Sequence, residues 1–596
     1  MQTSELHNRQ LLRLFVLDFL APHKIAFVRI GLFMLLSVGL QLPGPLLTMY
    51  VIDRVLPNHG TPLLNQILIL LIALIAARCL FSFLNESVTI QVKERIILEV
   101  QQRLITHIQK LPLSFFAEKQ SPYLQSRIMN DARSIDGALV RSLVALLLNV
   151  LLFVAGMVFV AIIYLPIGLI LIFGLAPFAY IRYFANERMR ALSRDLQETT
   201  AQASACVAER FAGNRLIKAY LQEDIQGGIA SEYLESLRQQ YVKTNMFGVL
   251  SSVGTGFVAA LTSAGILYYA AVLVMAGRIS LGQMVAVLSM LSFFFQPINE
   301  FVSANLKFQQ SVAAIRRIYE FLLLTPERVS GLQLPRAVKG RIEFRNVRFG
   351  YRPNRDVLQD VSFLIEPGAH VALAGRTGAG KTTLVNLLLG FYPVSSGRIE
   401  IDGFDIGGLA LGSLRERIGI VDQNAFLFSG SVRENVRMGK PSATPEEIVT
   451  ACIQSGAHEF VAQLPAGYDT PVGERGIRLS GGQCQKIALA RIFLKDPAIL
   501  ILDEAVSSID SQSESVIQQV LRRLMSGRTT IIVAHRLSSV LLANEVVLLE
   551  NGRIVERGTH ELLQEIDGSY AALFADQFEA GISRKAELAK LAPTAS

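Results

Sequence analysis

The sequence predicts a multidomain protein, in which an all-α polytopic membrane domain precedes an α/β domain that carries a phosphate loop. Two observations predict this fold class. The first half of the 596-residue chain holds six apolar stretches, and a helix of about 20 apolar residues spans the hydrocarbon core of a bilayer. The second half holds short apolar runs of the kind that form buried parallel strands, and a glycine-rich loop follows one of them.

Six membrane-spanning helices are predicted in the first half, with long helical extensions outside the membrane. They cover residues 25–50, 62–85, 138–163, 167–187, 246–275 and 281–305. The connections after the second and fourth spans are long and rich in Lys and Arg, whereas the short connections hold only Arg54 and Arg278. Positive residues stay on the cytoplasmic side of a membrane. Both long connections and both termini are therefore expected on the cytoplasmic side of an inner (plasma) membrane. The first span is expected to act as an uncleaved insertion signal.

The long connections show apolar residues at helical spacing over 86–110 and much of 192–221, so the spans are expected to continue into the cytoplasm as helices. Solvated amphipathic helices are the alternative. Ionisable and polar groups avoid lipid, so those within the spans are candidates for a transport path, although some can reach a membrane surface instead. The candidates are Gln41, Arg78, Arg141, Asn299 and Glu300, and kinks are expected at Pro43, Pro45, Pro177 and Pro297.

Composition excludes other classes. A net charge of +8 could indicate nucleic-acid binding, but membrane topology explains the basic residues better, and no nucleic-acid partner is expected. The four cysteines, Cys79, Cys206, Cys452 and Cys484, have neither metal-ligand nor disulfide spacing. The lipid bilayer is therefore the first partner that the sequence predicts.

The second half predicts an α/β core with an antiparallel portion. Residues 341–347 alternate as a half-buried strand, and 371–374, 499–502 and 529–534 are short buried strands. Residues 545–549 and 553–556 flank an Asn-Gly turn, which is typical of a hairpin. The predicted domains are a cytoplasmic segment 1–24, a membrane domain 25–324, a linker 325–340, a nucleotide-binding domain 341–575 and a tail 576–596.

A phosphate loop lies between a predicted strand and a predicted helix, which is the context that this motif requires. Its glycines let backbone N–H groups surround phosphates, Lys381 is expected at the β and γ oxygens, and Thr382 is expected to hold Mg²⁺. The cofactors are therefore ATP and Mg²⁺. The predicted nucleotide-binding residues here are Gly375, Arg376, Thr377, Gly378, Ala379, Gly380, Lys381, Thr382 and Thr383.

Two further motifs follow in order. The first is Leu479-Ser480-Gly481-Gly482-Gln483. The second is the pair Asp503-Glu504, which directly follows the predicted strand 499–502. With the phosphate loop, this ordered set resembles the ATP-binding-cassette (ABC) family over roughly residues 20–575. Asp503 is then expected in the Mg²⁺ shell, and Glu504 is placed to orient or deprotonate the attacking water.

The resemblance implies further roles. Tyr351 stacks on adenine, Gln423 reaches Mg²⁺ and senses the membrane domain, and His535 contacts the γ-phosphate. Asp510 lies in a loop of the nucleotide site. Ser480, Gly481, Gly482 and Gln483 press on the ATP that a second subunit holds. Glu504, His535 and Gln423 are thus the expected catalytic residues, with Thr382, Gln423 and Asp503 at the metal.

The resemblance also implies an exporter. Residues 111–116 and 211–220 look like coupling-helix regions, where the membrane domain docks on the ATPase, although Ser121-Pro122-Tyr123 departs from the usual motif. Cys484 replaces the usual Arg after the signature and is expected to be a small interface residue. No departure removes a catalytic group, so a homodimer with two active sites is expected, with a heterodimer as the alternative.

The expected function is therefore ATP-driven export of an unidentified substrate by a dimeric half-transporter. A flippase for a lipid or lipid-linked glycan is an alternative within transport. An ATP-gated channel or regulatory subunit is a second alternative, and intact Glu504 and His535 argue against it. A soluble chromosome- or repair-type ATPase shares the signature but not the six spans.

Overall fold

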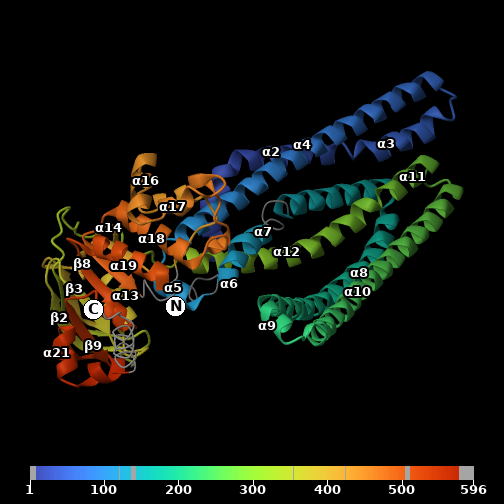
Figure 1. Ribbon diagram of the computed structural model, residues 1–596. Coiled ribbons are helices and arrows are strands. Elements are labelled where there is room, and N and C mark those ends of the chain that lie inside the picture. Colours follow the sequence, from blue (N-terminus) through green and yellow to red (C-terminus); the bar gives the residue numbers. More distant parts are fainter. Residues whose placement is uncertain are drawn as a thin grey trace, which may run out of the picture. The chain divides into compact units, whose positions relative to one another are not determined.

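The protein is described by a computed structural model, which covers residues 8–119, 121–135, 142–353, 355–422, 425–503 and 511–575 (Figure 1). Contacts within the chain divide it into two compact units. The first unit is Met1–Gln109 with Gln120–Leu324, and the second is Lys110–Lys119 with Thr325–Ser596. A short segment that the sequence places between two membrane helices therefore groups with the second unit.

The first unit is all-helical in its described residues, as predicted. Its elements are α1 (Asn8–Phe15), η2 (Val16–Leu20), η3 (Ala21–His23), α2 (Lys24–Gly39), α3 (Pro43–Tyr50), η4 (Val51–Val55), α4 (Thr61–Ile108), α6 (Ser121–Ser126), η5 (Arg127–Asp131), α7 (Ala132–Ser134), α8 (Ser142–Ala212), α9 (Asn214–Ala219), α10 (Glu223–Met275), α11 (Leu281–Met290) and α12 (Ser292–Leu322). The unbroken 48-residue helix α4 confirms that the second span continues outside the membrane.

Four helices among the described residues are long and apolar enough to cross a membrane, and a shorter apolar one follows them. They cover Arg9–Val55, Thr61–Ile108, Asn149–Ala212, Glu223–Met275 and, as the shorter helix, Leu281–Phe295. The third of these holds two predicted spans, because the chain turns at Tyr164. A Cβ atom on Gly168 would lie 3.9 Å from Cγ1 of Val160, whereas eight residues of straight helix cover about 12 Å. The described residues thus hold a helix for each predicted span.

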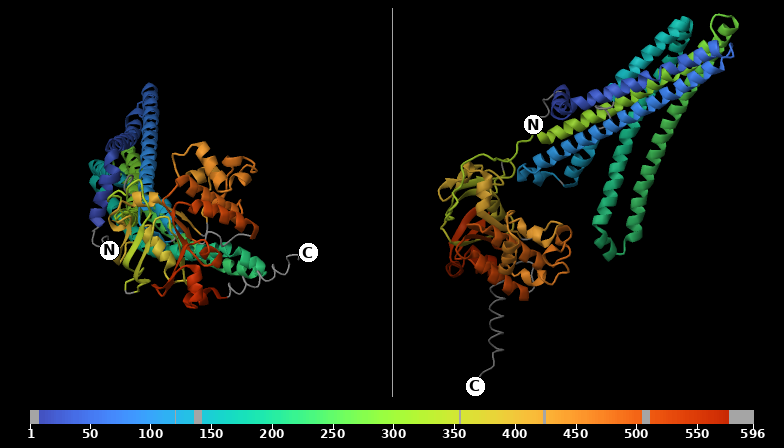
Figure 2. Two further views of the ribbon diagram at one scale, coloured as in Figure 1. Left: turned by 60° about the vertical axis from the view of Figure 1, so that its left-hand side comes forward. Right: turned by 90° about the horizontal axis from the view of Figure 1, so that it is seen from above.

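Close helix contacts shape this unit. The long helices α8 and α10 run side by side in all views (Figures 1 and 2). A Cβ atom on Gly174 of α8 would lie 2.2 Å from the side chain of Thr262 on α10, so only glycine fits at this crossing. Elsewhere, Asp53 accepts hydrogen bonds from the Ser280 hydroxyl and from the Gly282 N–H, which anchors the start of α11.

The polar and proline residues predicted within the spans lie as follows. The helix of the first span is interrupted at residues 40–42, directly before Pro43, and α3 begins at Pro43. This agrees with the preference of proline for a first helical turn, where its missing N–H group is not needed. Arg78 is exposed on α4, and Gln41 lies in the break itself. Arg141 and the side chains of Asn299 and Glu300 lie outside the described part.

The second unit contains two sheets and confirms the predicted α/β fold. An antiparallel sheet has the strand order β2-β1-β4-β5, and a six-stranded sheet has the order β10-β9-β3-β8-β7-β6. The last five strands of that order are parallel, and β10 pairs antiparallel with β9 as the predicted hairpin. The strands are β1 (Ile342–Phe349), β2 (Leu358–Ile365), β3 (His370–Ala374), β4 (Ser396–Ile401), β5 (Phe404–Asp405), β6 (Ile418–Val421), β7 (Ile499–Asp503), β8 (Thr529–Val533), β9 (Glu545–Glu550) and β10 (Arg553–Gly558).

Two separate apolar cores of this unit matter for the site. One core joins the two sheets to α13 through residues such as Leu373, Leu384 and Ile501. The other core is helical and includes Val436, Ile448 and Ile487. The helices are α5 (Leu113–Glu118), α13 (Lys381–Leu388), η6 (Ile406–Gly408), α14 (Leu411–Arg417), α15 (Val432–Arg437), α16 (Pro445–Gln454), α17 (His458–Val461), η7 (Gly467–Asp469), η8 (Glu474–Gly476), α18 (Gly481–Lys495), α19 (Ser511–Met525), α20 (Leu537–Val540) and α21 (His560–Glu565).

Candidate functional site

The phosphate loop connects β3 to α13, as the sequence predicts. Gly375, Gly378 and Gly380 have φ angles of +145°, +86° and +108°, a region that side chains rarely adopt. Gly375 also allows a close backbone approach, since a Cβ atom there would lie 2.3 Å from the carbonyl oxygen of Leu549. The loop ends where α13 begins, so the N–H groups of the first helical turn face the loop and favour anions.

Lys381 is the first residue of α13 and is buried. Its Nζ atom donates hydrogen bonds to the carbonyl oxygens of Gly375 at 2.6 Å and Arg376 at 3.2 Å. The ammonium group is therefore held inside the curl of the loop, where phosphate oxygens are expected. Among the other loop residues, Arg376, Thr377 and Gly378 are exposed and Ala379 is buried.

An aromatic cluster lies beside the first turns of α13. The Tyr351 hydroxyl donates to Oγ1 of Thr383 at 3.3 Å, and the Tyr351 ring meets Tyr392 edge-on with centroids 5.1 Å apart. Tyr351 remains about half exposed. The open ring beside the phosphate loop can therefore stack on a base. Sequence reasoning did not find Tyr392, which fixes this ring.

The register of the parallel sheet brings Asp503 and His535 to the same edge as the phosphate loop. Val533 of β8 is aligned with Asp503 of β7 on one side and with Leu373 of β3 on the other. His535 follows Val533 by two positions and is exposed. The carboxyl edge of a parallel sheet is where ligands bind in such folds. Gln423, Glu504 and Asp510, which were predicted for this site, lie outside the described residues.

The donor set at this edge fits Mg²⁺. This ion prefers oxygen ligands and usually takes one or two from protein, with phosphate oxygens and water supplying the others. Thr382 is exposed in the first turn of α13. Asp503 ends β7, which is separated by β8 alone from β3, the strand that leads into the phosphate loop. No cluster of three or more His, Cys, Asp or Glu able to hold a metal exists in the described residues. A site shared with nucleotide phosphates is the arrangement that suits these ligands.

The signature segment begins α18 and caps it. Oγ of Ser480 accepts from the Gln483 N–H at 3.3 Å, and Oε1 of Gln483 accepts from the Ser480 N–H at 3.0 Å. This reciprocal capping box fixes the helix start. Apart from their chain neighbours and the backbone of α18 itself, no described heavy atom lies within 4 Å of a Cβ atom built on Gly481 or Gly482. The N-terminal end of α18 is thus open, and its backbone N–H groups can bind an anion.

Cys484 is not an interface residue, contrary to expectation. It is 9% exposed and belongs to the helical core, where its Sγ atom contacts Gly476. Burial raises the pKa of its thiol above the ordinary value. About two turns further along α18, Arg491 donates to the carbonyl oxygens of Phe426 and Asn435. Sequence reasoning missed Arg491, which ties α18 to the segment that follows Gln423.

Comparison with known proteins agrees with this geometry. The family model for the ABC transporter transmembrane region matches residues 27–298, and the ABC transporter model matches residues 358–507. A Bacillus subtilis protein, provisionally named a multidrug export ATP-binding/permease protein, is 33% identical over 94% of this chain and 98% of its own. An ATP-dependent lipid A-core flippase of Legionella pneumophila is 34% identical over 91% of this chain and 92% of its own.

A solved structure of a bacterial Atm1-family ABC exporter with ATP bound superposes with a TM-score of 0.78. It is 28% identical and covers 94% of this chain and 99% of its own. Both the membrane helices and the α/β unit therefore have counterparts in one known fold. The chain belongs to the ABC transporter family, as an exporter-type half-transporter whose ATPase unit couples ATP hydrolysis to transport across a membrane.

Proposed function

We propose that two copies of this chain form a homodimeric exporter that binds two ATP molecules between its ATPase units. The open end of α18 carries this proposal. Ser480 and Gly481 are exposed on the helical core, whereas the phosphate loop lies on the sheet core. The chain therefore has two anion sites for one nucleotide. A second copy explains both, because the signature of one chain then meets the γ-phosphate that the other chain holds.

The tip formed by α9 and the residues on either side of it supports an interaction with another protein surface. Its apolar side chains Phe211, Leu216, Tyr220 and Leu221 are between 62% and 84% exposed. Large exposed apolar groups gathered at a helix turn are typical of an interaction site. The tip lies between two helices that run on from membrane spans, so we assign it to docking on an ATPase unit in the cytoplasm. In this proposed orientation, the ATPase unit and both termini lie on the cytoplasmic side of the plasma membrane.

The site residues take the roles that their positions favour. Lys381 and the loop N–H groups bind the β- and γ-phosphates, and Tyr351 stacks on adenine. Thr382, Asp503 and Gln423 would hold Mg²⁺, which when bound neutralises charge on the phosphates. Glu504 orients or deprotonates the attacking water, and His535 contacts the γ-phosphate. Asp510 is expected in a loop of the same nucleotide site.

Mixed dimers test the pairing of sites. One chain carries Lys381→Ala and the other carries Ser480→Arg, with different affinity tags so that only mixed dimers are purified. Both lesions then fall in one composite site, and the other site keeps two intact halves. We expect ATP hydrolysis to persist at up to about half of the wild-type rate if the sites act independently. If two differently tagged copies of this chain never co-purify through both tags, the result would favour a heterodimer with another protein.

For cargo, we propose an amphipathic molecule taken from the inner leaflet or the cytoplasm. The relatives named for multidrug export and for lipid A-core flipping support this class. Purified dimers in proteoliposomes separate the two readings. Stimulation of ATPase activity and leaflet movement by a lipid A-type glycolipid, but not by cationic dyes, would favour the flippase. The reverse result would favour drug export, and ionic currents with bound but unhydrolysed ATP would indicate a channel.

A further inference from the structure

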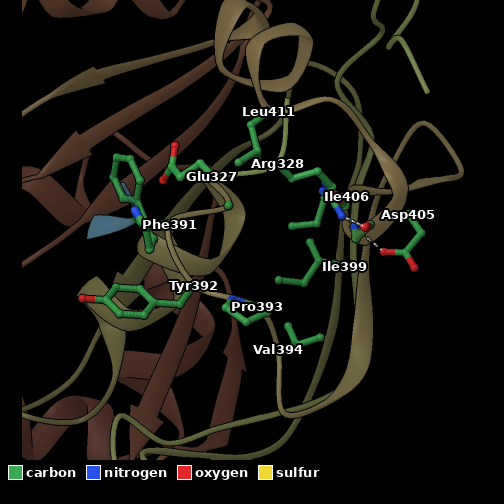
Figure 3. Close-up of a pocket in the computed structure, with 13 residues that line it drawn as sticks. Glu327, Arg328, Phe391, Tyr392, Pro393, Val394, Ile399, Asp405, Ile406 and Leu411 are labelled. Atoms are coloured by element: carbon green, nitrogen blue, oxygen red, sulfur yellow. Dashed lines mark hydrogen bonds between the residues drawn. The ribbon is translucent and has the colours of Figure 1, made fainter. Parts of the chain in front are cut away.

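An ion pair in the second unit joins the linker to α14. Glu327 accepts from Nη1 of Arg415 at 2.6 Å and from Nη2 at 3.0 Å, so the carboxylate and guanidinium groups meet in a bidentate pair. Glu327 also lies next to a cavity of about 280 Å³, with Phe391 and Leu411 among its walls (Figure 3). The bidentate geometry fixes direction as well as distance.

Arg415 also holds the far end of the helix that starts at the phosphate loop. Its Nε atom donates to the carbonyl oxygen of Leu389 at 3.1 Å, and its Nη2 atom donates to that of Gly390 at 3.3 Å. These carbonyls follow the end of α13, where a cation is favoured. The guanidinium carbon lies 4.9 Å from the centre of the Phe391 ring. Arg415 is thus bound to α13 even without Glu327.

The helix that starts at the signature also ends on α14. Lys495 is the last residue of α18, and its Nζ atom donates to the carbonyl oxygens of Arg415 at 2.8 Å and Ile418 at 2.7 Å. Burial lowers the pKa of Lys495. Both helices that begin at a phosphate-binding element therefore end on one short helix. The strand β6, which leads toward Gln423, starts directly after it.

The linker residue Glu327 also binds the segment that lies between two membrane helices in the sequence. The Glu327 N–H donates to the carbonyl oxygen of Lys110 at 2.7 Å. Lys110–Lys119 groups with the second unit, yet the chain enters it from α4 and leaves it toward α6. Through its backbone and its carboxylate, Glu327 thus connects this segment to α14.

We propose that Glu327 and Arg415 are positioning residues that transmit nucleotide-driven movement of the ATPase unit to the membrane helices. This inference rests on the proposed function. ATP held between two copies would act on α13 through the phosphate loop and on α18 through the signature, and both helices end on α14. Arg415 passes the movement to Glu327, and Glu327 passes it to Lys110 and so to the ends of α4 and α6. Neither residue belongs to the phosphate loop or to the signature segment.

The test separates ATP hydrolysis from movement in the full-length protein. Glu327→Gln removes the charge while Arg415 keeps its bonds to α13, so folding and nucleotide binding should survive. Glu545→Gln is a matched control, because Glu545 forms a similar bidentate pair with Arg557 at 2.6 and 3.0 Å in the same unit. Each variant also carries Glu232→Cys on α10 for spin labelling and Cys79→Ser. Distances between the two labels are measured without nucleotide and with ATP and vanadate.

We expect Glu327→Gln to keep KM for ATP within about twofold and kcat within about threefold of wild type. Its nucleotide-dependent shift in label distance should fall to less than half, whereas Glu545→Gln should shift as wild type does. A full shift in Glu327→Gln would overturn the inference, and so would a loss of ATP binding together with the shift. If unaltered protein neither dimerises nor hydrolyses ATP, the proposed function fails instead.

Discussion

Arg317 binds both carboxylate oxygens of Asp131, with Nε to Oδ2 at 2.9 Å and Nη2 to Oδ1 at 2.7 Å. Arg127 adds a third hydrogen bond to Oδ2 at 2.8 Å. Asp131 is 6% exposed, and it joins η5 to the last helix of the first unit. Burial raises the pKa of Asp131, but the bonds from Arg317 and Arg127 outweigh it and hold the pKa below its ordinary value.

Asp131→Asn should strongly destabilise the membrane unit, because it leaves two arginines without their buried partner. Breaking such a pair costs about 3–5 kcal/mol. In an Arg317→Met background the same substitution should cost clearly less, which a double-mutant cycle on thermal unfolding measures. Equal costs in both backgrounds would show that the pair contributes nothing. Since the folded pKa is lowered, the stabilisation is present above the ordinary pKa of 3.8 and is lost as pH falls below it.

Lys381→Ala should abolish most ATP hydrolysis, because the buried ammonium group no longer meets the phosphate oxygens. Loss of one such electrostatic contact typically lowers kcat by about 10²–10³-fold. Lys440→Ala is the matched control, since Lys440 is an exposed lysine outside the phosphate loop that pairs with Glu447 on the surface of the same unit. A steady-state phosphate-release assay should show a near-normal rate for the control. A near-normal rate for Lys381→Ala would show that the loop is not the catalytic phosphate site.

Two glycines of the same loop should respond differently to alanine. Gly375→Ala places a Cβ atom 2.3 Å from the Leu549 carbonyl oxygen and should cost about 3 kcal/mol or more. Gly378→Ala meets no described atom within 4 Å and should cost only the backbone strain of about 1–2 kcal/mol. Thermal unfolding monitored with and without ATP compares them. Equal destabilisation would mean that steric contact with β9 is unimportant.

Periodicity and composition predicted most of the fold. Apolar length identified the spans, and the four-residue run 371–374 identified the strand before the phosphate loop. They did not predict the Asp131–Arg317 or Glu327–Arg415 pairs, because charged residues far apart in sequence look solvated until the fold joins them. Arg491 was missed for the same reason.

Cys484 was placed wrongly because position within a motif does not determine which face of the helix is buried. The loop at Gly476, with φ of +75°, brings Leu427 against the same face of α18 and covers the thiol. Thiol reagents at Cys484 therefore cannot report dimer closure. The roles of Gln423, Glu504 and Asp510 remain predictions from sequence and family resemblance.

Glu504→Gln should bind ATP almost normally and hydrolyse it about 10²–10⁴-fold more slowly, because general-base assistance is lost while the phosphate loop remains. ATP should then accumulate between the two chains and keep the dimer closed, by mass action on the closed state. Filter binding and single-turnover hydrolysis measure the two effects separately. Fast hydrolysis by the variant would show that another residue activates the attacking water. Weak ATP binding by the variant would show that Glu504 contributes to binding ATP.

The composite ATP site is tested most directly by a disulfide between chains. Gly378 has a φ of +86°, so the exposed neighbour Thr377 is the better position for one cysteine, and Gly482 takes the other. Chains with Thr377→Cys and chains with Gly482→Cys, both also with Cys79→Ser, are co-purified and oxidised with and without ATP. We predict a cross-linked pair of chains that forms only with ATP. The absence of a cross-link between chains in the presence of ATP would contradict the account. A separate chain that carries both cysteines is oxidised as well, and a cross-link within that single chain would also contradict it.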